Sequence, residues 1–204
     1  MSDGGVLLVE GRDDQHVIWA LLKVHKVPEV FKVEQAGSVE ELLSSVPVRL
    51  KGSDRRLAVV LDANQSLQTR WDALRDRLRT AGFHGVPKDL SAFGTVVDFP
   101  RRRRLGVWLM PDNRLPGILE DFLTFLVPRE DTMLPRVDAF LSMIPAVERR
   151  FPESRRPKAR IHTWLAVQEE PGKPLGQSIT ARYLDAEAQV VGPFLNWLRA
   201  VLVD

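Results

Sequence analysis

The chain contains the stretch Leu57-Ala58-Val59-Val60-Leu61-Asp62-Ala63-Asn64, in which a short apolar run ends at an aspartate. Continuous apolar runs that are too brief for a helix are typical of strands buried on both faces. The same pattern occurs in Val6-Leu7-Leu8-Val9-Glu10-Gly11 and in Leu105-Gly106-Val107-Trp108-Leu109-Met110-Pro111-Asp112-Asn113. In an open parallel sheet, such strands deliver the residues that follow them to one edge, where ligands bind. We therefore expect three acidic positions to meet at the carboxyl edge of one sheet.

Helical patterns alternate with these strands in the first half of the chain, which predicts an α/β fold with a mainly parallel sheet flanked by helices. A second strand is expected at residues 30–33, and residues 95–100 and 105–110 are expected to form a hairpin or the sheet edge. Apolar spacing and capping residues predict helices over residues 13–26, 38–50 and 66–81, with Pro47 interrupting the second of them.

The strand signal disappears after residue 128. A helix is expected to open at Pro116, and further helices are expected at residues 137–144, 159–167, 178–184 and 190–202. The predicted organisation is an α/β core at residues 1–125 and a helical C-terminal extension at residues 126–204 that packs on it. The five tryptophans lie within apolar patterns and are expected in the core.

The composition excludes several classes of protein. The 204 residues include no cysteine, which rules out disulfides, thiolate zinc sites and a cysteine nucleophile. No apolar stretch approaches the roughly 20 residues that span a bilayer, and no basic region precedes Val6, so no signal peptide is expected. These features predict a cytoplasmic protein without a membrane partner, and they leave a homodimer open.

Acidic and amide side chains at the three strand ends are the candidate metal ligands. They are Glu10, Asp62, Asn64, Asp112 and, from the helix after the last strand, Glu120. Carboxylates that meet in a dry pocket repel one another, and a hard divalent cation such as Mg²⁺ or Mn²⁺ relieves the repulsion. Each position has a simpler explanation as a turn or helix-capping residue, and this explanation is the stronger one for Asp13 and Asp14.

Basic residues gather in two local runs, although the formal net charge is only +2. Their guanidinium and ammonium groups suit the phosphates of nucleic acid, although a solvated surface is the alternative interpretation. The residues are Arg101, Arg102, Arg103, Arg104, Arg155, Arg156 and Lys158. Lys173 lies in a Gly-Lys-Pro-Leu-Gly segment that lacks the spacing of a nucleotide-binding loop but is able to contact a phosphate or a scissile group.

Two of these segments resemble the Toprim domain, which topoisomerases, primases, recombination-repair proteins and nucleases of the overcoming-lysogenisation-defect (OLD) group share. Val9-Glu10-Gly11 matches its glutamate after the first strand, and Asp62 matches the first aspartate of its Asp-x-Asp motif. Asn64 replaces the second aspartate. The segments 108–113 and 116–122, together with 164–176, resemble small stand-alone Toprim-like proteins that look related to nucleases of phage defence.

The resemblance implies a Rossmann-like core and a Mg²⁺- or Mn²⁺-dependent nuclease, in a defence or DNA-repair system, that acts on nucleic acid, with DNA favoured over RNA. Glu10, Asp62 and Lys173 would be catalytic, and Glu10, Asp62, Asn64, Asp112 and Glu120 would hold metal. The alternative is a catalytically weak binding or regulatory module that acts with an ATPase partner, because Asn64 brings no charge. A phosphatase with a nucleophilic aspartate is disfavoured, because the residues after Asp62 lack the required pattern.

Overall fold

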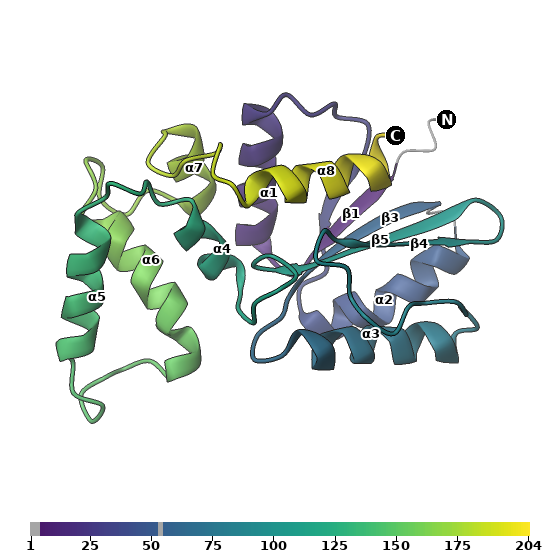
Figure 1. Ribbon diagram of the computed structural model, residues 1–204, viewed down its shortest axis with the longest axis horizontal. Helices are drawn as coiled ribbons and strands as arrows, with labels where there is room; N and C mark the ends of the chain where they lie inside the picture. Colours follow the sequence, from purple (N-terminus) through teal and green to yellow (C-terminus); the bar gives the residue numbers. More distant parts are fainter. Residues whose placement is uncertain (1–4, 53–54) are drawn as a thin grey trace.

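A five-stranded sheet runs through the computed structural model, which describes residues 5–52 and 55–204 (Figure 1). Its strands are β1 (Val6–Val9), β2 (Lys32–Gln35), β3 (Arg56–Asp62), β4 (Thr95–Phe99) and β5 (Arg103–Met110). Their order is β2-β1-β3-β5-β4, and only the edge strand β4 is antiparallel to its neighbour. The predicted mainly parallel sheet is therefore confirmed. Residues 1–4, on which the prediction of no signal peptide partly rests, lie outside the described residues, as do residues 53 and 54.

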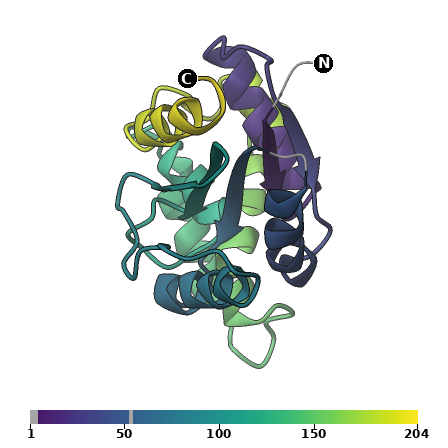
Figure 2. The same cartoon turned by 90° about the vertical axis from the view of Figure 1, so that its right-hand side faces the viewer.

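Helices cover both faces of the sheet. They are α1 (Arg12–Val24), α2 (Val39–Lys51), α3 (Leu67–Thr80), α4 (Leu119–Phe125), α5 (Met133–Met143), the 3₁₀ helix η1 (Glu153–Arg155), α6 (Arg156–Ala166), α7 (Leu175–Thr180) and α8 (Val191–Leu202). In Figure 2, the purple α1 and the yellow α8 lie above the strands, whereas the blue α2 and α3 lie below them. The result is a three-layer α/β/α arrangement, which explains why the central strands are apolar on both faces.

Alternate residues of the central strands enter two separate hydrophobic cores. Leu7 and Val9 of β1 face α1 and α8, whereas Val6 and Leu8 face α2 and α3. Gly106 of β5 lets α8 approach closely, because a Cβ at this position would lie 2.4 Å from a methyl group of Val201. The C-terminal helix is thus part of one of the layers that bury the sheet.

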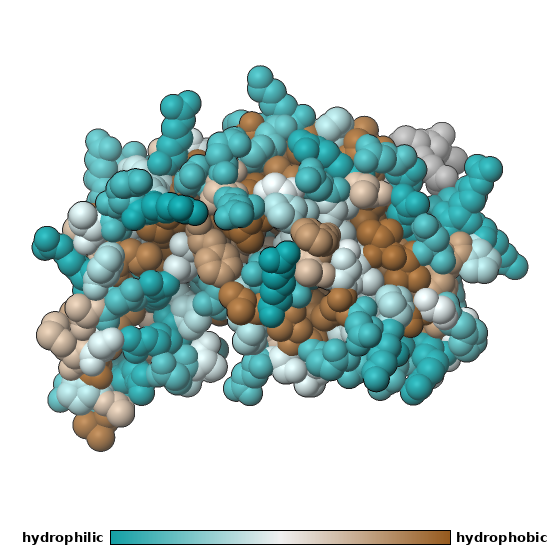
Figure 3. All heavy atoms as spheres, viewed as in Figure 1, coloured by the Kyte–Doolittle hydropathy of each residue, from teal (hydrophilic) through white to brown (hydrophobic). Residues whose placement is uncertain are grey.

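Helices α5 and α6 form a hairpin that extends away from the sheet at the left of Figure 1. Its tip carries hydrophobic surface (Figure 3). In α5 and the segment that follows it, Phe140, Met143 and Val147 are exposed. The described residues after 126 contain no strand, while α8 packs on β3 and β5. The boundary at residue 125 stays a prediction. No helix among residues 5–52 and 55–204 has the length and apolar character needed to cross a membrane.

Several local predictions were wrong. Pro47 lies inside α2, which continues to Lys51, because burial of Leu42, Leu43, Val46, Pro47 and Leu50 outweighs one lost backbone hydrogen bond. Pro116 lies in a loop, and α4 begins three residues later at Leu119. The expected strand at residues 30–33 begins at Lys32, and the expected helix at residues 178–184 occupies Leu175–Thr180. Trp19 is 47% exposed and stacks on His16, whereas the other four tryptophans are buried.

Candidate active site

Glu10 and Asp62 meet at the carboxyl edge of the sheet. Glu10 directly follows β1, and Asp62 is the last residue of the neighbouring parallel strand β3. The Oε1 atom of Glu10 accepts a hydrogen bond from the backbone N–H of Asp62 at 2.9 Å. The expected meeting of these two acids therefore occurs, and the backbone of one residue holds the side chain of the other.

Two further carboxylates join them from the first turns of two helices. Glu120 of α4 is only 5% exposed, and the adjacent Leu119 N–H donates to Asp62 Oδ1 at 2.9 Å. Asp14 of α1 accepts a hydrogen bond from the Gly11 N–H at 3.1 Å through Oδ2. The charges of Glu10 and Glu120 act on both aspartates. Four carboxylates from three parts of the chain thus form one electrostatic group, which we call the carboxylate cluster: Glu10, Asp14, Asp62 and Glu120.

Protons are held tightly in the carboxylate cluster. Loss of solvent on burial raises the pKa of Glu10 above its usual range. Burial, with the charge of Glu10 as the next cause, raises the pKa of Asp14 to about 7. Burial and the charges of Glu10, Asp14 and Glu120 raise the pKa of Asp62 to about 8, although the Leu119 N–H opposes this shift. Near neutral pH, the cluster consequently shares protons that a cation would replace.

Two cationic side chains border the carboxylate cluster. Lys158, from the first turn of α6, lies 3.2 Å from Glu120 Oε1 and 4.0 Å from Asp13 Oδ2. Its side chain is 49% exposed, so one end of the cluster is open to solvent. Arg70 of α3 donates from Nε to the Asp62 carbonyl oxygen at 3.0 Å, and its charge lowers the pKa of Glu10. The site therefore combines acidic groups with cations that suit an anionic ligand.

The donor set of the carboxylate cluster fits a hard divalent cation, since it consists of carboxylate oxygens. Among residues 5–52 and 55–204, however, no three His, Asp or Glu side chains form a group that could hold a metal ion as they stand. One oxygen each of Glu10, Asp14 and Asp62 is taken by a backbone N–H, and Glu120 pairs with Lys158. Metal binding at this site would thus require these side chains to rearrange.

Asn64 and Asp112 lie apart from this group. Asn64 is exposed, has a positive φ of 53°, and pairs through its backbone with Gly117. The Oδ1 atom of Asp112 accepts hydrogen bonds from the N–H groups of Arg114 and Leu115 at 3.0 and 2.8 Å. Asp112 is not among the charges that shift the pKa of Glu10, Asp14 or Asp62. Its role in the structure is that of a turn residue, the simpler of the two expectations.

The predicted basic residues lie at different places. Lys173 pairs with Glu170 at 2.7 Å and lies 5.9 Å from the centre of the Tyr183 ring. Arg103 and Arg104 begin β5, and Arg104 pairs in register with Arg56 at the start of β3, so the turn at residues 101–104 occupies the amino edge of the sheet. Arg104 is also held by Asp98 at 2.7 Å. At about 3.3 Å per residue, this turn is roughly 25 Å from the carboxylate cluster.

The second basic run lies on the same side of the molecule as the carboxylate cluster, but its residues make different contacts. Lys158 contacts the carboxylate cluster, whereas Arg156 donates to Ser142 at 2.8 Å and lies 3.9 Å from Glu153. Arg155 is exposed at the end of the 3₁₀ helix η1.

Sequence reasoning missed Asp14, because its position at a helix start already explained it as a cap. Asp14 does cap α1, yet its place one helical turn after Glu10 is the signal that could have identified it.

Comparisons with known proteins place the chain in a family without an assigned activity. A family model described as "Protein of unknown function (DUF3226)" matches residues 5–203. Among solved structures, the C-terminal region of the OLD protein of Xanthomonas campestris pv. campestris is similar, with 14% sequence identity and a TM-score of 0.44. The similarity covers 97% of this chain and 91% of that chain. No curated protein matches the sequence.

Proposed function

Because the chain belongs to the DUF3226 family of unknown function, we propose from its own geometry that it performs Mg²⁺- or Mn²⁺-dependent phosphodiester chemistry on nucleic acid, as a Toprim-type nuclease. One observation carries this proposal. Glu10, Asp14, Asp62 and Glu120 come from the ends of β1 and β3 and the starts of α1 and α4, and they share one partly dry site. Such a set is costly to hold together unless it binds a cation or a proton.

In this proposal, Glu10, Asp62 and Glu120 hold the metal, and Asp14 is an additional ligand or exchanges a proton. When bound, a divalent cation would supply charge stabilisation to a phosphoryl group and acidify a water molecule. The protein's own contribution is to fix the acids on rigid elements. The Asp62 N–H orients Glu10, and the Leu119 N–H orients Asp62. Lys158 is half exposed, so it is placed to receive a phosphate while it remains near Glu120.

A second candidate function is a binding or regulatory module that acts with an ATPase partner. Two observations favour it. Asn64 is uncharged and lies outside the carboxylate cluster. In the described part of the chain, no three acidic side chains form a group that could hold a metal ion as they stand. In that case, the raised pKa values of Asp14 and Asp62 would reflect protonated, hydrogen-bonded carboxyls, and catalysis would be weak or absent.

Calorimetric titration of Mg²⁺ and Mn²⁺ separates the two candidates. Glu10→Gln and Asp62→Asn are suitable variants, because each amide retains the oxygen that accepts the backbone hydrogen bond. Asp112→Asn is the matched control, since Asp112 lies at the same sheet edge but outside the cluster. We expect saturable binding that weakens by at least about tenfold in the first two variants and is unchanged in the control. Absence of binding at millimolar metal would instead favour the module.

A further inference from the structure

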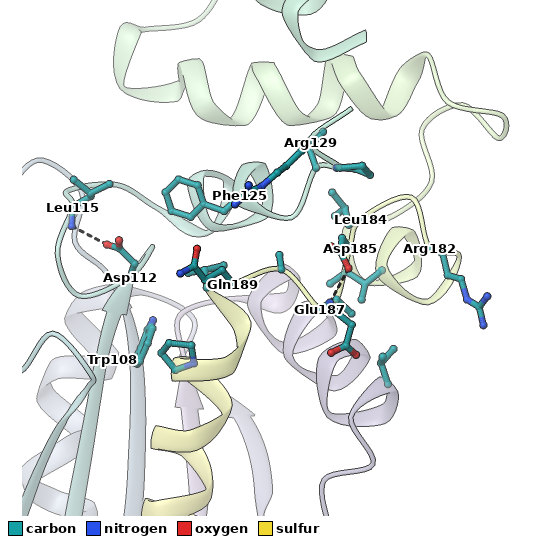
Figure 4. Close-up of a pocket in the computed structure, with 18 of the residues that line it drawn as sticks. Trp108, Asp112, Leu115, Phe125, Arg129, Arg182, Leu184, Asp185, Glu187 and Gln189 are labelled. Carbon is teal, nitrogen blue, oxygen red and sulfur yellow. Dashed lines mark hydrogen bonds between the residues drawn. The ribbon is translucent and has the colours of Figure 1, made fainter. Parts of the chain in front are cut away.

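A cleft of about 1620 Å³ opens beside the carboxyl end of β5. Its walls come from the turn that follows β5, the end of α4 and the segment that leads into α8 (Figure 4). Figure 4 shows Trp108, Asp112, Phe125 and Gln189 around the same space. The carboxylate cluster does not line this cleft, so it is a separate feature of the molecule.

An unpaired hydrogen-bond donor lies in the wall of the cleft. Trp108 is only 1% exposed, and its Nε1 atom is buried without a hydrogen-bond partner among the described residues. The nitrogen end of the indole ring is turned toward the side of the cleft where Asp112 and Gln189 lie (Figure 4). A buried N–H without an acceptor costs about 1–3 kcal/mol, so this position favours a ligand that brings an acceptor atom.

Aromatic rings and a guanidinium plane lie at the mouth of the same cleft. Phe93 is 66% exposed and Phe125 is 42% exposed, although aromatic side chains of this size are usually buried. The guanidinium carbon of Arg114 lies 5.3 Å from the centre of the Phe93 ring. Exposed aromatic rings together with arginine are the groups on which unpaired nucleobases stack.

The cleft is connected to the carboxylate cluster through two short segments. The loop after β5 contributes Asp112 and Leu115 to the cleft, and a few residues later Leu119 donates its N–H to Asp62. Helix α4 carries Glu120 of the carboxylate cluster in its first turn and ends at Phe125, which lines the cleft. At 1.5 Å per residue, these two residues are about 8 Å apart along the helix. One strand of nucleic acid is long enough to occupy both places.

We infer that the cleft receives an unpaired nucleobase of a single strand whose backbone passes the carboxylate cluster. This inference rests on the proposed function and names the form of its substrate. The base stacks on Phe125 or Phe93, and a ring nitrogen or carbonyl oxygen of the base accepts from Trp108 Nε1. Asp112 provides an acceptor, and Gln189 an amide, for the hydrogen-bonding groups on the edge of the base. A heteroaromatic ring with donors and acceptors on its edge matches these walls better than a purely apolar ligand does.

The test is a binding measurement in the presence of a chelator, so that metal-dependent cleavage does not contribute. Fluorescence anisotropy compares a short labelled oligodeoxythymidine with an abasic oligomer of equal length, which has the same phosphates but no bases. We expect the base-bearing strand to bind more tightly. Phe125→Ala and Phe93→Ala should each weaken its binding by roughly tenfold, because stacking of a base is worth about 1–3 kcal/mol.

Two further variants complete the test. Trp108→Phe keeps an aromatic ring in the core but removes the N–H, so weaker binding would identify this atom as a donor to the base. Phe140→Ala is the matched control, because Phe140 is 51% exposed on α5 and does not line the cleft. Equal affinity for the intact and abasic strands, or equal affinity of Phe125→Ala and Phe140→Ala, would overturn the inference.

Failure of this inference is distinguishable from failure of the proposed function. Metal-dependent cleavage that persists without any base-dependent binding would overturn the base-binding cleft alone. Base-dependent binding that persists in a protein without metal affinity would support the cleft and overturn the nuclease.

Discussion

Glu10 Oε1 accepts the backbone N–H of Asp62 at 2.9 Å, so a side chain that follows β1 is held by the main chain at the end of β3. This contact fixes Glu10 next to the Asp62 carboxylate, although the two groups repel each other when both are ionised. The Leu119 N–H holds Asp62 in the same way from the start of α4. Backbone donors therefore maintain an arrangement that the side-chain charges oppose.

The contribution of Asp62 to the stability of the metal-free protein should fall as the pH rises from about 4 to about 8. The pKa of Asp62 rises from 3.8 to about 8 on folding, so within this window the folded protein binds more protons than the unfolded chain. Rising pH therefore favours unfolding until the folded pKa is passed. Asp62→Asn removes one charge but keeps the acceptor for Leu119 N–H. It should stabilise the protein by at least about 1 kcal/mol at pH 8 and have little effect at pH 4.

Thermal unfolding in a chelator across this pH range measures the effect. Asp98→Asn is the control, because Asp98 is an exposed partner of Arg104 whose pKa is lowered by that hydrogen bond. If the unfolding midpoints of Asp62→Asn and the wild type differ by the same amount at every pH, protonation of Asp62 does not cause the pH dependence.

Asn64→Asp should not create or strengthen a metal site. The residue is exposed, adopts a positive φ of 53°, and is held by its backbone against Gly117, away from the carboxylate cluster. Asparagine and aspartate both tolerate this backbone conformation, so the variant should fold. Calorimetry should give the same Mn²⁺ affinity as the wild type within about twofold. A tenfold gain would mean that the side chain turns into the cluster and that its charge is the missing ligand.

Lys158 should contact substrate, whereas Lys173 should not. Lys158→Met removes the cation nearest Glu120, and Lys173→Met removes a cation that is already paired with Glu170. The first substitution should weaken nucleic-acid binding and reduce the slope of log affinity against log salt concentration by about one. The second should leave the slope unchanged. Binding measured at several salt concentrations decides between them, and the opposite pattern would restore the role predicted for Lys173 from the sequence.

The arginine turn should act only on long substrates. Arg101 and Arg102 are exposed at the amino edge of the sheet, roughly 25 Å from the carboxylate cluster. Replacement of both residues by alanine should leave cleavage of a short oligonucleotide unchanged and lower the affinity for a long duplex several-fold at low salt. An equal loss on short and long substrates would show that the turn serves the cluster directly.

The sequence determined the layers of this protein and the two acids at its centre. Apolar runs in β1, β3 and β5 are too short for helices and too apolar for exposed strands, so they had to be buried in a parallel sheet. Parallel strands end at one edge of the sheet, so Glu10 and Asp62, which lie at the ends of neighbouring parallel strands, are expected to meet there. These relationships are local in the chain or are fixed by strand direction, which is why a pattern of residues can reveal them.

Only the tertiary structure decided which other side chains join that edge. Asp14 and Glu120 belong to helix starts whose position depends on how α1 and α4 pack. Asp112 lies outside the carboxylate cluster, and its Oδ1 atom accepts hydrogen bonds from the N–H groups of Arg114 and Leu115. The tertiary structure likewise placed Lys158 beside Glu120 and Arg101 at the far edge, although both belong to similar basic runs. The positions of α1, α4 and α6 relative to the sheet edge depend on how whole helices pack, and no periodicity within a single segment records them.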